Sequence, residues 1–338
     1  MGRLQKWIDR VKGAAPLELT FVPEIAVDGI PGIGEPIEKD SCYVEFYLES
    51  LRLAQARRFA TNFHAVAYSF VTLPREGDVR AHLAAISKAT NLAQLDKESL
   101  DRVITVSKQM MGPTAYRGGP ISLEFGLFSV KTGNLLTPLL EYITQVSSTA
   151  GISYVGAIKP FVPLIIQGLD LIAGQPQDTA LEVGVDTSLN LTKGCVAAII
   201  ALPKSELGDL SLDKDFKLLS DGEPLECGYA VFSFRRNDEK SDYAEIPELR
   251  ERYEAIRAAI RNNKKADAED ALATFRLATI ASPDLIPDDA TGLVEKVEKK
   301  VKAAFPPGGT AGVGGEVLDE TLAEIGLYGS RTKHALRH

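Results

Sequence analysis

The sequence predicts an α+β protein. We expect an antiparallel β-sandwich or strongly bent sheet over residues 17–245, followed by a helical bundle over 246–305. Short apolar runs with period-two alternation recur up to residue 236 and are joined mostly by short links, which favours antiparallel strands. Beyond residue 246 the apolar residues change to helical spacing. The chain has 338 residues, 45% of them hydrophobic, which is enough for a sizeable core.

The first two strands are expected at 17–27 and 42–49. In the second, apolar side chains fall on every other residue, which is typical of a strand with one buried face; they are Cys42, Val44, Phe46 and Leu48. The Gly- and Pro-rich stretch 28–36 lies between the two strands. It lacks the GK[ST] ending of a phosphate-binding loop, so we interpret it as a turn.

Two further apolar runs, 63–73 and 120–130, are expected to be strands of the same domain. The segment between them is more polar, and DKES at 96–99 resembles the start of a helix. We therefore expect a helical insertion over 79–110.

Residues 134–173 predict a second insertion, made of two consecutive apolar helices. The second helix, 152–173, is apolar over most of its circumference, which is typical of a helix in a core or in a membrane. It carries Lys159 and Asp170, and a charge near a bilayer centre costs about 2.5–3.5 kcal/mol. A buried core helix is therefore the favoured interpretation, and a hairpin that enters a membrane is the alternative.

Two hairpins are expected in the last part of the β domain. The residues TKG at 192–194 predict a tight link between the alternating run 180–191 and the apolar run that begins at Cys195. The dipeptide Asp221-Gly222 predicts another hairpin ahead of the strand at 229–234.

Three helices are expected after residue 246. Their buried stripes are predicted from helical spacing; they are Leu249, Tyr253, Ile256 and Ile260, then Leu272 and Phe275, then Leu293, Val294, Val297, Val301 and Phe305. Pro247 suits the first turn of the first helix. Ser282-Pro283-Asp284 resembles a cap and predicts the start of the last one.

Both ends of the chain predict amphipathic segments that dock on a surface. Residues 1–16 form a basic amphipathic helix, and 306–338 form a Gly-rich linker with a tail helix. The candidate interaction residues are Leu4, Trp7, Ile8, Val11, Leu318, Leu322 and Ile325. Each stripe can fold back on its own domain or bind a partner.

The sequence predicts no catalytic residue, no metal and no cofactor. Only His64 and His82 lie in the body of the chain, and no Cys and His residues have zinc-ligand spacing before the tail. Three widely spaced cysteines are expected to be buried and reduced, as in a cytosolic protein. The acidic stretch 206–221 is interpreted as a solvated loop, with calcium binding as the alternative.

These observations favour a non-enzymatic interaction or scaffold subunit of a larger assembly, expected in the cytoplasm and docking through its terminal segments. Its partner is expected to be a protein or a second copy of the chain. The net charge of −8 argues against nucleic acid. The alternative function is a peripheral membrane-active protein that uses 134–173 or the basic N-terminus. An enzyme with a scattered site is the third hypothesis.

Overall fold

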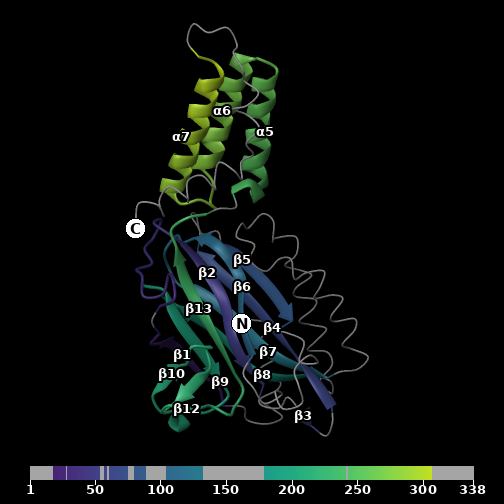
Figure 1. Cartoon of the computed structure of the whole chain (residues 1–338), viewed down its shortest axis with the longest axis vertical. Coiled ribbons are helices and arrows are strands. Elements are labelled where there is room, and N and C mark those ends of the chain that lie inside the picture. Colours follow the sequence, from purple (N-terminus) through teal and green to yellow (C-terminus); the bar gives the residue numbers. More distant parts are fainter. Residues whose placement is uncertain are drawn as a thin grey trace. The chain divides into compact units, whose positions relative to one another are not determined.

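The fold is α+β, with antiparallel sheets and three C-terminal helices (Figure 1). The computed structural model describes residues 18–27, 29–53, 57–58, 61–74, 80–88, 104–131, 179–240 and 243–306. The chain divides into two compact units. The first comprises Met1–Glu38, Val44–Pro113 and Arg117–Arg236, and the second Lys39–Tyr43, Thr114–Tyr116 and Asn237–His338. The predicted α+β class is confirmed.

The first sheet has the strand order β1-β9-β13-β2-β6. Its strands are β1 (Thr20–Ile25), β9 (Cys195–Ile200), β13 (Tyr229–Asn237), β2 (Tyr43–Arg52) and β6 (Ile104–Ala115). Strand β9 pairs antiparallel with both β1 and β13, and the pairing with β1 begins at Thr20 opposite Ile200. The strands predicted at 17–27, 42–49 and 229–234 are therefore confirmed, and they belong to one sheet.

The second sheet is built around two long strands. It contains β3 (Arg57–Arg58), β4 (Thr61–Pro74), β7 (Ile121–Lys131) and β8 (Thr179–Leu189) in that order, and β5 (Arg80–Lys88) also pairs with β4. All of these pairings are antiparallel. The strands predicted at 63–73, 120–130 and 180–191 are confirmed.

The helical insertion predicted over 79–110 is wrong where the structure describes this segment. Strand β5 pairs with β4 along its whole length, from Arg80 opposite Pro74 to Lys88 opposite Val66. Residues 104–110 belong to β6. The long apolar strand β4 offers pairing partners that outweigh the weak local preference of a polar segment for helix. Residues 89–103, which include DKES, lie outside the described residues.

The predicted hairpin at 192–194 is also wrong, because β8 and β9 belong to different sheets. The connection instead bonds to the Gly-rich loop. The amide of Ile37 donates to the carbonyl of Thr192, and the amide of Gly194 donates to that of Glu35, each at 2.9 Å. A Cβ at Gly194 would lie 1.8 Å from the Gly32 carbonyl oxygen, so the approach of the two loops requires glycine.

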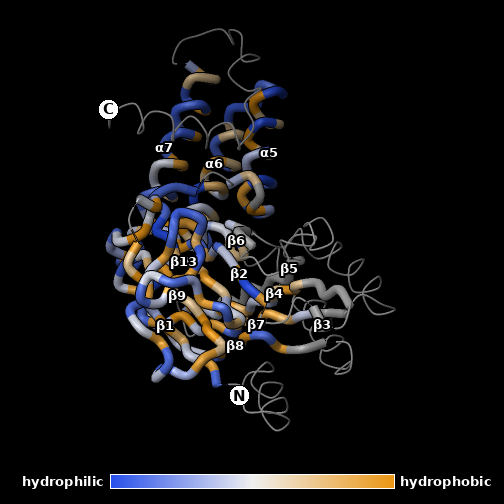
Figure 2. Tube along the Cα trace, turned by 60° about the horizontal axis from the view of Figure 1, so that its bottom comes forward, coloured by the Kyte–Doolittle hydropathy of each residue, from blue (hydrophilic) through white to orange (hydrophobic). Residues whose placement is uncertain are grey.

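An aromatic cluster contains side chains from both five-stranded sheets. Phe232 of β13 lies 5.6 Å from Phe46 of β2 and 5.8 Å from Phe125 of β7, measured between ring centroids. All three side chains are fully buried. Figure 2 shows the hydrophobic residues that recur along the strands of both sheets. This cluster is the centre of the core in the first unit.

A small third sheet follows β9. It contains β10 (Leu210–Leu212), β11 (Leu218–Ser220) and β12 (Glu223–Pro224), preceded by the 3₁₀ turn η5 (Lys204–Glu206). The turn between β11 and β12 has positive φ at both central residues, 51° at Asp221 and 84° at Gly222. These angles are those of a type I′ turn, so the hairpin predicted from Asp-Gly is confirmed.

The second unit contains η6 (Tyr243–Glu245), α5 (Pro247–Arg261), α6 (Lys265–Ile280) and α7 (Pro287–Ala304). Helix α6 packs against both α5 and α7. The predicted stripes of α5 and α7 are buried except Phe305, which is half-buried. In the α6 stripe, Phe275 is fully buried and Leu272 half-buried.

The two predicted helix starts differ in outcome. Pro247 occupies the first turn of α5 as expected, but the start predicted at 282–284 is wrong. Pro287 begins α7 and also suits a first turn, because its missing N–H is not needed there. The Ser282 hydroxyl accepts a hydrogen bond from the Asp284 amide at 3.3 Å, so it caps a turn in the preceding loop.

Several predicted segments lie outside the described residues. These are the N-terminal helix within 1–16, the apolar helices of 134–173 and the tail beyond residue 306. Among the helices that the structure describes, none combines the length and apolar character that a membrane span requires.

Candidate interaction surface

Helix α6 exposes an apolar face. Leu277 and Ile280 are the large hydrophobic residues that are exposed in the described part of the chain, with 71% and 59% of their surface accessible. Ala273 and Ala281 are also exposed and fall at helical spacing with them. We call these four residues the outer face of α6. Large exposed apolar side chains that gather on one helix face mark interaction sites.

The outer face lies opposite the side of α6 that is buried in its own unit. Ala268, Phe275 and Thr279 are fully buried and lie on one side of the helix. Leu277 falls about 180° from the centre of that stripe at 100° per residue. The burial of one side and the exposure of the other follow from contact with both α5 and α7.

Sequence reasoning missed this surface. The helical spacing placed Phe275 in the core correctly, but the stripe that contains it leaves out Leu277 and Ile280. The information was present in the sequence, because Leu277 and Ile280 fall outside the stripe that contains Phe275. A helix with apolar residues on two opposite sides can bury only one of those sides in a single core, so the other side stays exposed.

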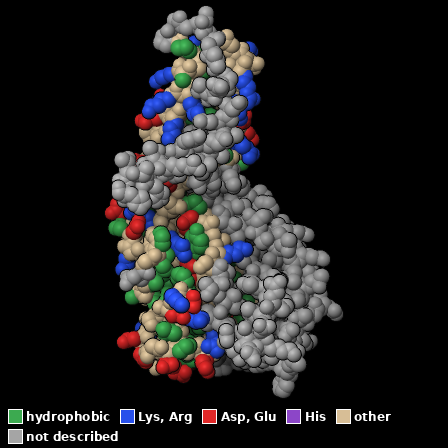
Figure 3. Space-filling model, viewed as in Figure 1, with side chains coloured by type: hydrophobic (Ala, Val, Ile, Leu, Met, Phe, Trp, Pro, Cys, Tyr) green, Lys and Arg blue, Asp and Glu red, His purple; other side chains and the backbone are tan. Residues whose placement is uncertain are grey.

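The part of the neighbouring helix α7 that lies beside α6 is rich in lysine. Residues 295–302 hold four lysines and two glutamates. One glutamate, Glu298, lies 3.6 Å from the guanidinium of Arg276 on α6 and 3.9 Å from the ammonium of Lys302. Figure 3 shows Lys and Arg side chains on both sides of the helical unit, with Asp and Glu side chains among them. The α7 side of the outer face therefore favours an acidic occupant.

The interaction residues predicted from sequence all lie outside the described residues; they are Leu4, Trp7, Ile8, Val11, Leu318, Leu322 and Ile325. The structure places His64 in β4 opposite Val130, and His82 in β5 opposite Thr72. The two histidines are thus parts of paired strands.

None of the three cysteines forms a disulfide in the structure. Cys42 is buried, whereas Cys195 and Cys227 are only half-buried, which corrects the prediction for these two. Burial is the main cause that raises the pKa of Cys195 to about 11, with a further contribution from Glu24. Burial also raises the pKa of Cys227. Both thiols are therefore protonated at neutral pH and are poor nucleophiles.

A buried carboxylate on the first sheet is held by its neighbours. Glu49 of β2 is fully buried and accepts hydrogen bonds from Ser107 at 3.1 Å, from Arg235 at 2.6 Å and from Ser233. The Arg235 guanidinium also lies 4.2 Å from the ring centroid of Tyr47. The carboxylate is therefore occupied by three donors, and we interpret the cluster as a link between β2, β6 and β13.

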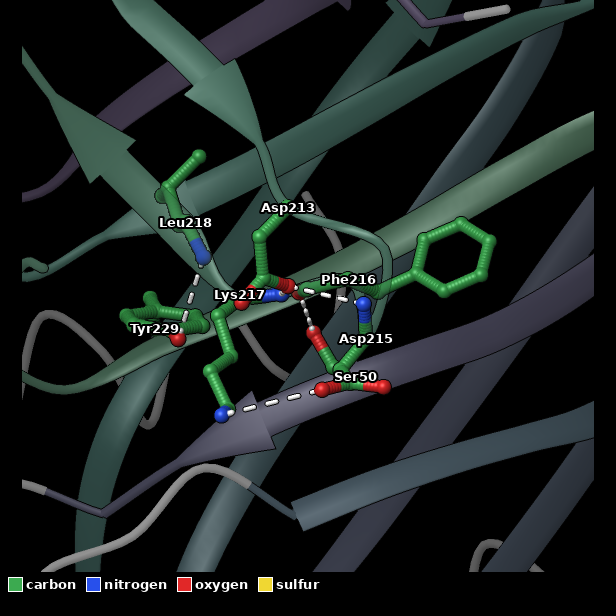
Figure 4. A network of polar contacts seen from close by, with 7 residues as sticks. All are labelled: Ser50, Asp213, Asp215, Phe216, Lys217, Leu218 and Tyr229. Carbon is green, nitrogen blue, oxygen red and sulfur yellow. Dashed lines mark hydrogen bonds and ion pairs between the residues drawn. The ribbon is translucent and has the colours of Figure 1, made fainter. Parts of the chain in front are cut away.

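The acidic stretch 206–221 uses its carboxylates to hold its own turns. One oxygen of Asp213 accepts from the amides of Asp215 and Lys217, each at 2.8 Å (Figure 4). The carboxylate of Asp221 accepts from the amide of Asp209 at 2.9 Å. Within the described ranges, no three or more His, Cys, Asp or Glu residues are grouped so that they could hold a metal ion.

The same network predicts a pH-dependent stability. The hydroxyl of Tyr229 accepts a hydrogen bond from the Leu218 amide at 3.2 Å, and burial raises the pKa of Tyr229 to about 12 (Figure 4). Because this pKa lies above the value of 10 for an unburied tyrosine, the contribution is complete below pH 10 and is lost as pH rises to about 12. The two-unit shift corresponds to about 3 kcal/mol.

We expect Tyr229→Phe to lower the free energy of unfolding by about 1–3 kcal/mol at pH 7, because the buried Leu218 amide loses its acceptor. We also expect the variant to lose less stability than the wild type between pH 10 and 12. Urea unfolding over this range measures both effects. Equal losses in the two proteins would show that Tyr229 does not contribute.

A second buried polar cluster lies at the start of α7. The hydroxyls of Tyr43 and Tyr243 donate to Asp289 at 2.8 and 3.1 Å, and the Ile286 amide donates to Tyr43 at 3.1 Å. Burial, followed by the negative charge of Asp289, raises the pKa of Tyr43. These bonds hold the first turn of α7, so we interpret them as structural.

Comparisons of the chain with protein-family models, curated proteins and solved structures found no match. The function is therefore inferred from the residues themselves. In the part of the chain that the structure describes, the polar clusters bind groups within the fold, whereas the outer face of α6 presents apolar side chains to solvent.

Proposed function

We propose that this protein is a non-enzymatic interaction or scaffold subunit of a larger protein assembly, and that it binds through apolar helical surfaces. The observation that carries the proposal is the exposure of Leu277 and Ile280 on the outer face of α6. Fully burying a side chain of this size contributes about 1.5–3 kcal/mol. The two together can supply a substantial part of the free energy of a weak helix–surface contact.

The terminal segments are the docking elements in this proposal. The N-terminal stripe contains Leu4, Trp7, Ile8 and Val11, and the C-terminal one contains Leu318, Leu322 and Ile325. Helices shorter than about 12–15 residues are marginal alone in water, so each segment needs a surface to become ordered. An amphipathic helix in an apolar groove is a common mode of protein recognition. The proposed partner is a protein or a second copy of the chain.

We also infer the finer architecture in which these surfaces are set. The two five-stranded sheets are proposed to form an antiparallel sandwich, which the contact between Phe125 and Phe232 supports. Helices α5, α6 and α7 are proposed to form a bundle, supported by the packing of α6 against both neighbours. The three thiols, none of which forms a disulfide in the structure, support a reducing compartment such as the cytoplasm.

A peripheral membrane protein is the alternative proposal. It is favoured by the N-terminal segment, where Arg3, Lys6, Arg10 and Lys12 surround the apolar stripe. A basic amphipathic helix binds anionic lipid surfaces through both features. Flotation of the protein with anionic liposomes, but not with neutral ones, would favour this alternative, and loss of flotation after deletion of residues 1–15 would assign it to the N-terminus.

The interaction proposal predicts the effect of removing the ends. Deletion of residues 316–338 is expected to leave the melting temperature nearly unchanged but to weaken self-association or partner binding, because the segment contributes to the assembly more than to the fold. Deletion of residues 1–15 is expected to act in the same way. Sedimentation velocity over a concentration series measures association, and thermal unfolding measures stability.

The matched control keeps the length of the chain. Replacing Leu318, Leu322 and Ile325 by serine should reproduce the effect of the C-terminal deletion, because only the apolar stripe is removed. If both truncations lower the melting temperature and leave every assembly intact, the ends are parts of the fold and the proposal loses its main support.

A further inference from the structure

We propose that the outer face of α6 is the docking surface for the chain's own C-terminal segment, residues 316–328, bound as an acidic amphipathic helix. The inference rests on the proposed function and deepens it, because it assigns a binding surface to one docking element and an occupant to the exposed apolar face. A partner that binds either element would then compete with this internal contact.

The first argument is the matching spacing of the two apolar stripes. On α6 the exposed residues Ala273, Leu277 and Ile280 follow the pattern i, i+4, i+7. In the tail, Leu318, Leu322 and Ile325 follow the same pattern. Residues three and four apart are neighbours on a helix surface, so each set forms one continuous ridge. When two helices meet, the ridge of one fits into a groove of the other.

The second argument is the complementary charge. Residues 316–328 contain four acidic residues and no Lys or Arg; the acids are Glu316, Asp319, Glu320 and Glu324. Beside the outer face, residues 295–302 of α7 contain four lysines and two glutamates, and α6 itself carries the exposed Arg276 as well as the exposed acids Asp267, Glu269 and Asp270 on its N-terminal half. In a helix that docks through Leu318, Leu322 and Ile325, Asp319 lies about 90° from the apolar stripe and can face these cations, whereas Glu316 and Glu320 lie on the far side. Such an arrangement favours this segment over the basic N-terminal one.

The third argument is the reach of the linker. The ion pair between Arg276 and Glu298, with the nitrogen and oxygen 3.6 Å apart, places residue 298 of α7 beside the outer face. Residue 306 follows eight residues later, about 12 Å further along the helix direction at 1.5 Å per residue. The ten-residue linker 306–315 has an expected span of roughly 17 Å and a maximum near 33–36 Å. It can therefore return the tail to Leu277.

The same linker decides between the chain's own tail and that of a second copy. A short flexible tether gives an effective concentration on the order of millimolar. At micromolar protein, the tail of another molecule is about a thousand times more dilute. The internal contact therefore forms first, unless the geometry prevents it.

Photo-crosslinking in the full-length protein tests the inference. p-Benzoylphenylalanine replaces Leu277, whose exposure makes the change compatible with folding, and replaces exposed Ala258 on α5 in the control protein. We expect the probe at 277 to link to residues 316–328 within a monomer, with at least fivefold the yield of the probe at 258. Peptide mass spectrometry locates the link, and denaturing electrophoresis separates monomer from dimer.

Two tail variants distinguish the apolar and charged contributions. Leu322→Ser is expected to reduce the link from position 277 at least fivefold, and Asp319→Lys is expected to reduce it about threefold. Links to the tail that occur only between chains would overturn the internal contact and assign the surface to a second copy. The absence of any tail link from position 277, with the melting temperature unchanged, would overturn it entirely.

The outcomes separate this inference from the proposed function. A strong internal link, together with assembly that is insensitive to the truncations, would keep the α6 contact and reject the interaction function of the ends. Loss of assembly on truncation, without any link from 277 to the tail, would keep the function and reject the docking surface.

Discussion

Replacing Phe232 by alanine is expected to lower the free energy of unfolding by about 3–5 kcal/mol. The side chain is fully buried and its ring lies within 5.6–6.2 Å of four other phenylalanine rings, those of Phe21, Phe46, Phe125 and Phe234. Because these rings come from both sheets, the cavity cannot be closed by the movement of a single strand. Urea unfolding followed by circular dichroism measures the change.

Phe21→Ala is the matched control for this prediction. Phe21 stacks on Phe232 at 6.2 Å but is only half-buried on β1, so a loss of about 1–2 kcal/mol is expected. Should the Phe232 variant be too unstable to purify, Phe232→Leu removes less volume and gives a smaller measurable loss. Equal, small losses for Phe232→Ala and Phe21→Ala would mean that the ring cluster does not form the centre of the core.

Replacing Arg235 by methionine is expected to cost about 3 kcal/mol, because it leaves the carboxylate of Glu49 fully buried without its cationic partner. Methionine keeps most of the length of the side chain, so the loss of charge dominates the effect. The same change also removes the guanidinium above the ring of Tyr47. Chemical unfolding of the purified variant measures the loss.

The double variant Arg235→Met with Glu49→Gln isolates the interaction between the two charges. It is expected to be more stable than Arg235→Met alone, because no unpaired charge then remains buried. If the double variant is instead less stable by the sum of the two single losses, the two side chains do not interact and the cluster is not a charge pair.

Local patterns predicted elements but not their partners. The alternation around Phe46 and the helical spacing around Ile256 depend on residues near each other in the chain, and both elements are present. The pairing of β1 with β9 depends on residues about 180 positions apart, and nothing in either segment names the other. The same lack of long-range information made the hairpin at 192–194 wrong, because two consecutive strands belong to different sheets.

Two errors had a physical origin in competing preferences. Residues 80–88 look polar and helix-like alone, but the edge of β4 provides a row of backbone partners that a short helix cannot match. At the start of α7, Ser282 and Pro287 both satisfy the rules for a helix terminus, and the choice between them depends on the bond from Ile286 to Tyr43.

The candidate site could be predicted only in part. Residues 316–328 alone predict a tail helix with an apolar stripe and several acidic residues. Which surface could receive it is not, because the exposure of Leu277 depends on how α6 is covered by α5 and α7. The spacing of apolar residues indicates which sides of a helix can bind another surface. The packing of its neighbours decides which of those sides stays exposed.

Because Thr20 pairs with Ile200, the first sheet cannot be completed until the chain has been synthesised past residue 200. When strand β1 has been synthesised, its partner β9 is not yet made. At 5–20 residues per second, β1 waits roughly 10–40 seconds for the chain to reach residue 200. Strands β4 and β5 are neighbours in sequence, so they can pair soon after both have been synthesised. During synthesis the second sheet can therefore begin while the first still lacks β9 and β13, the two strands that lie between β1 and β2.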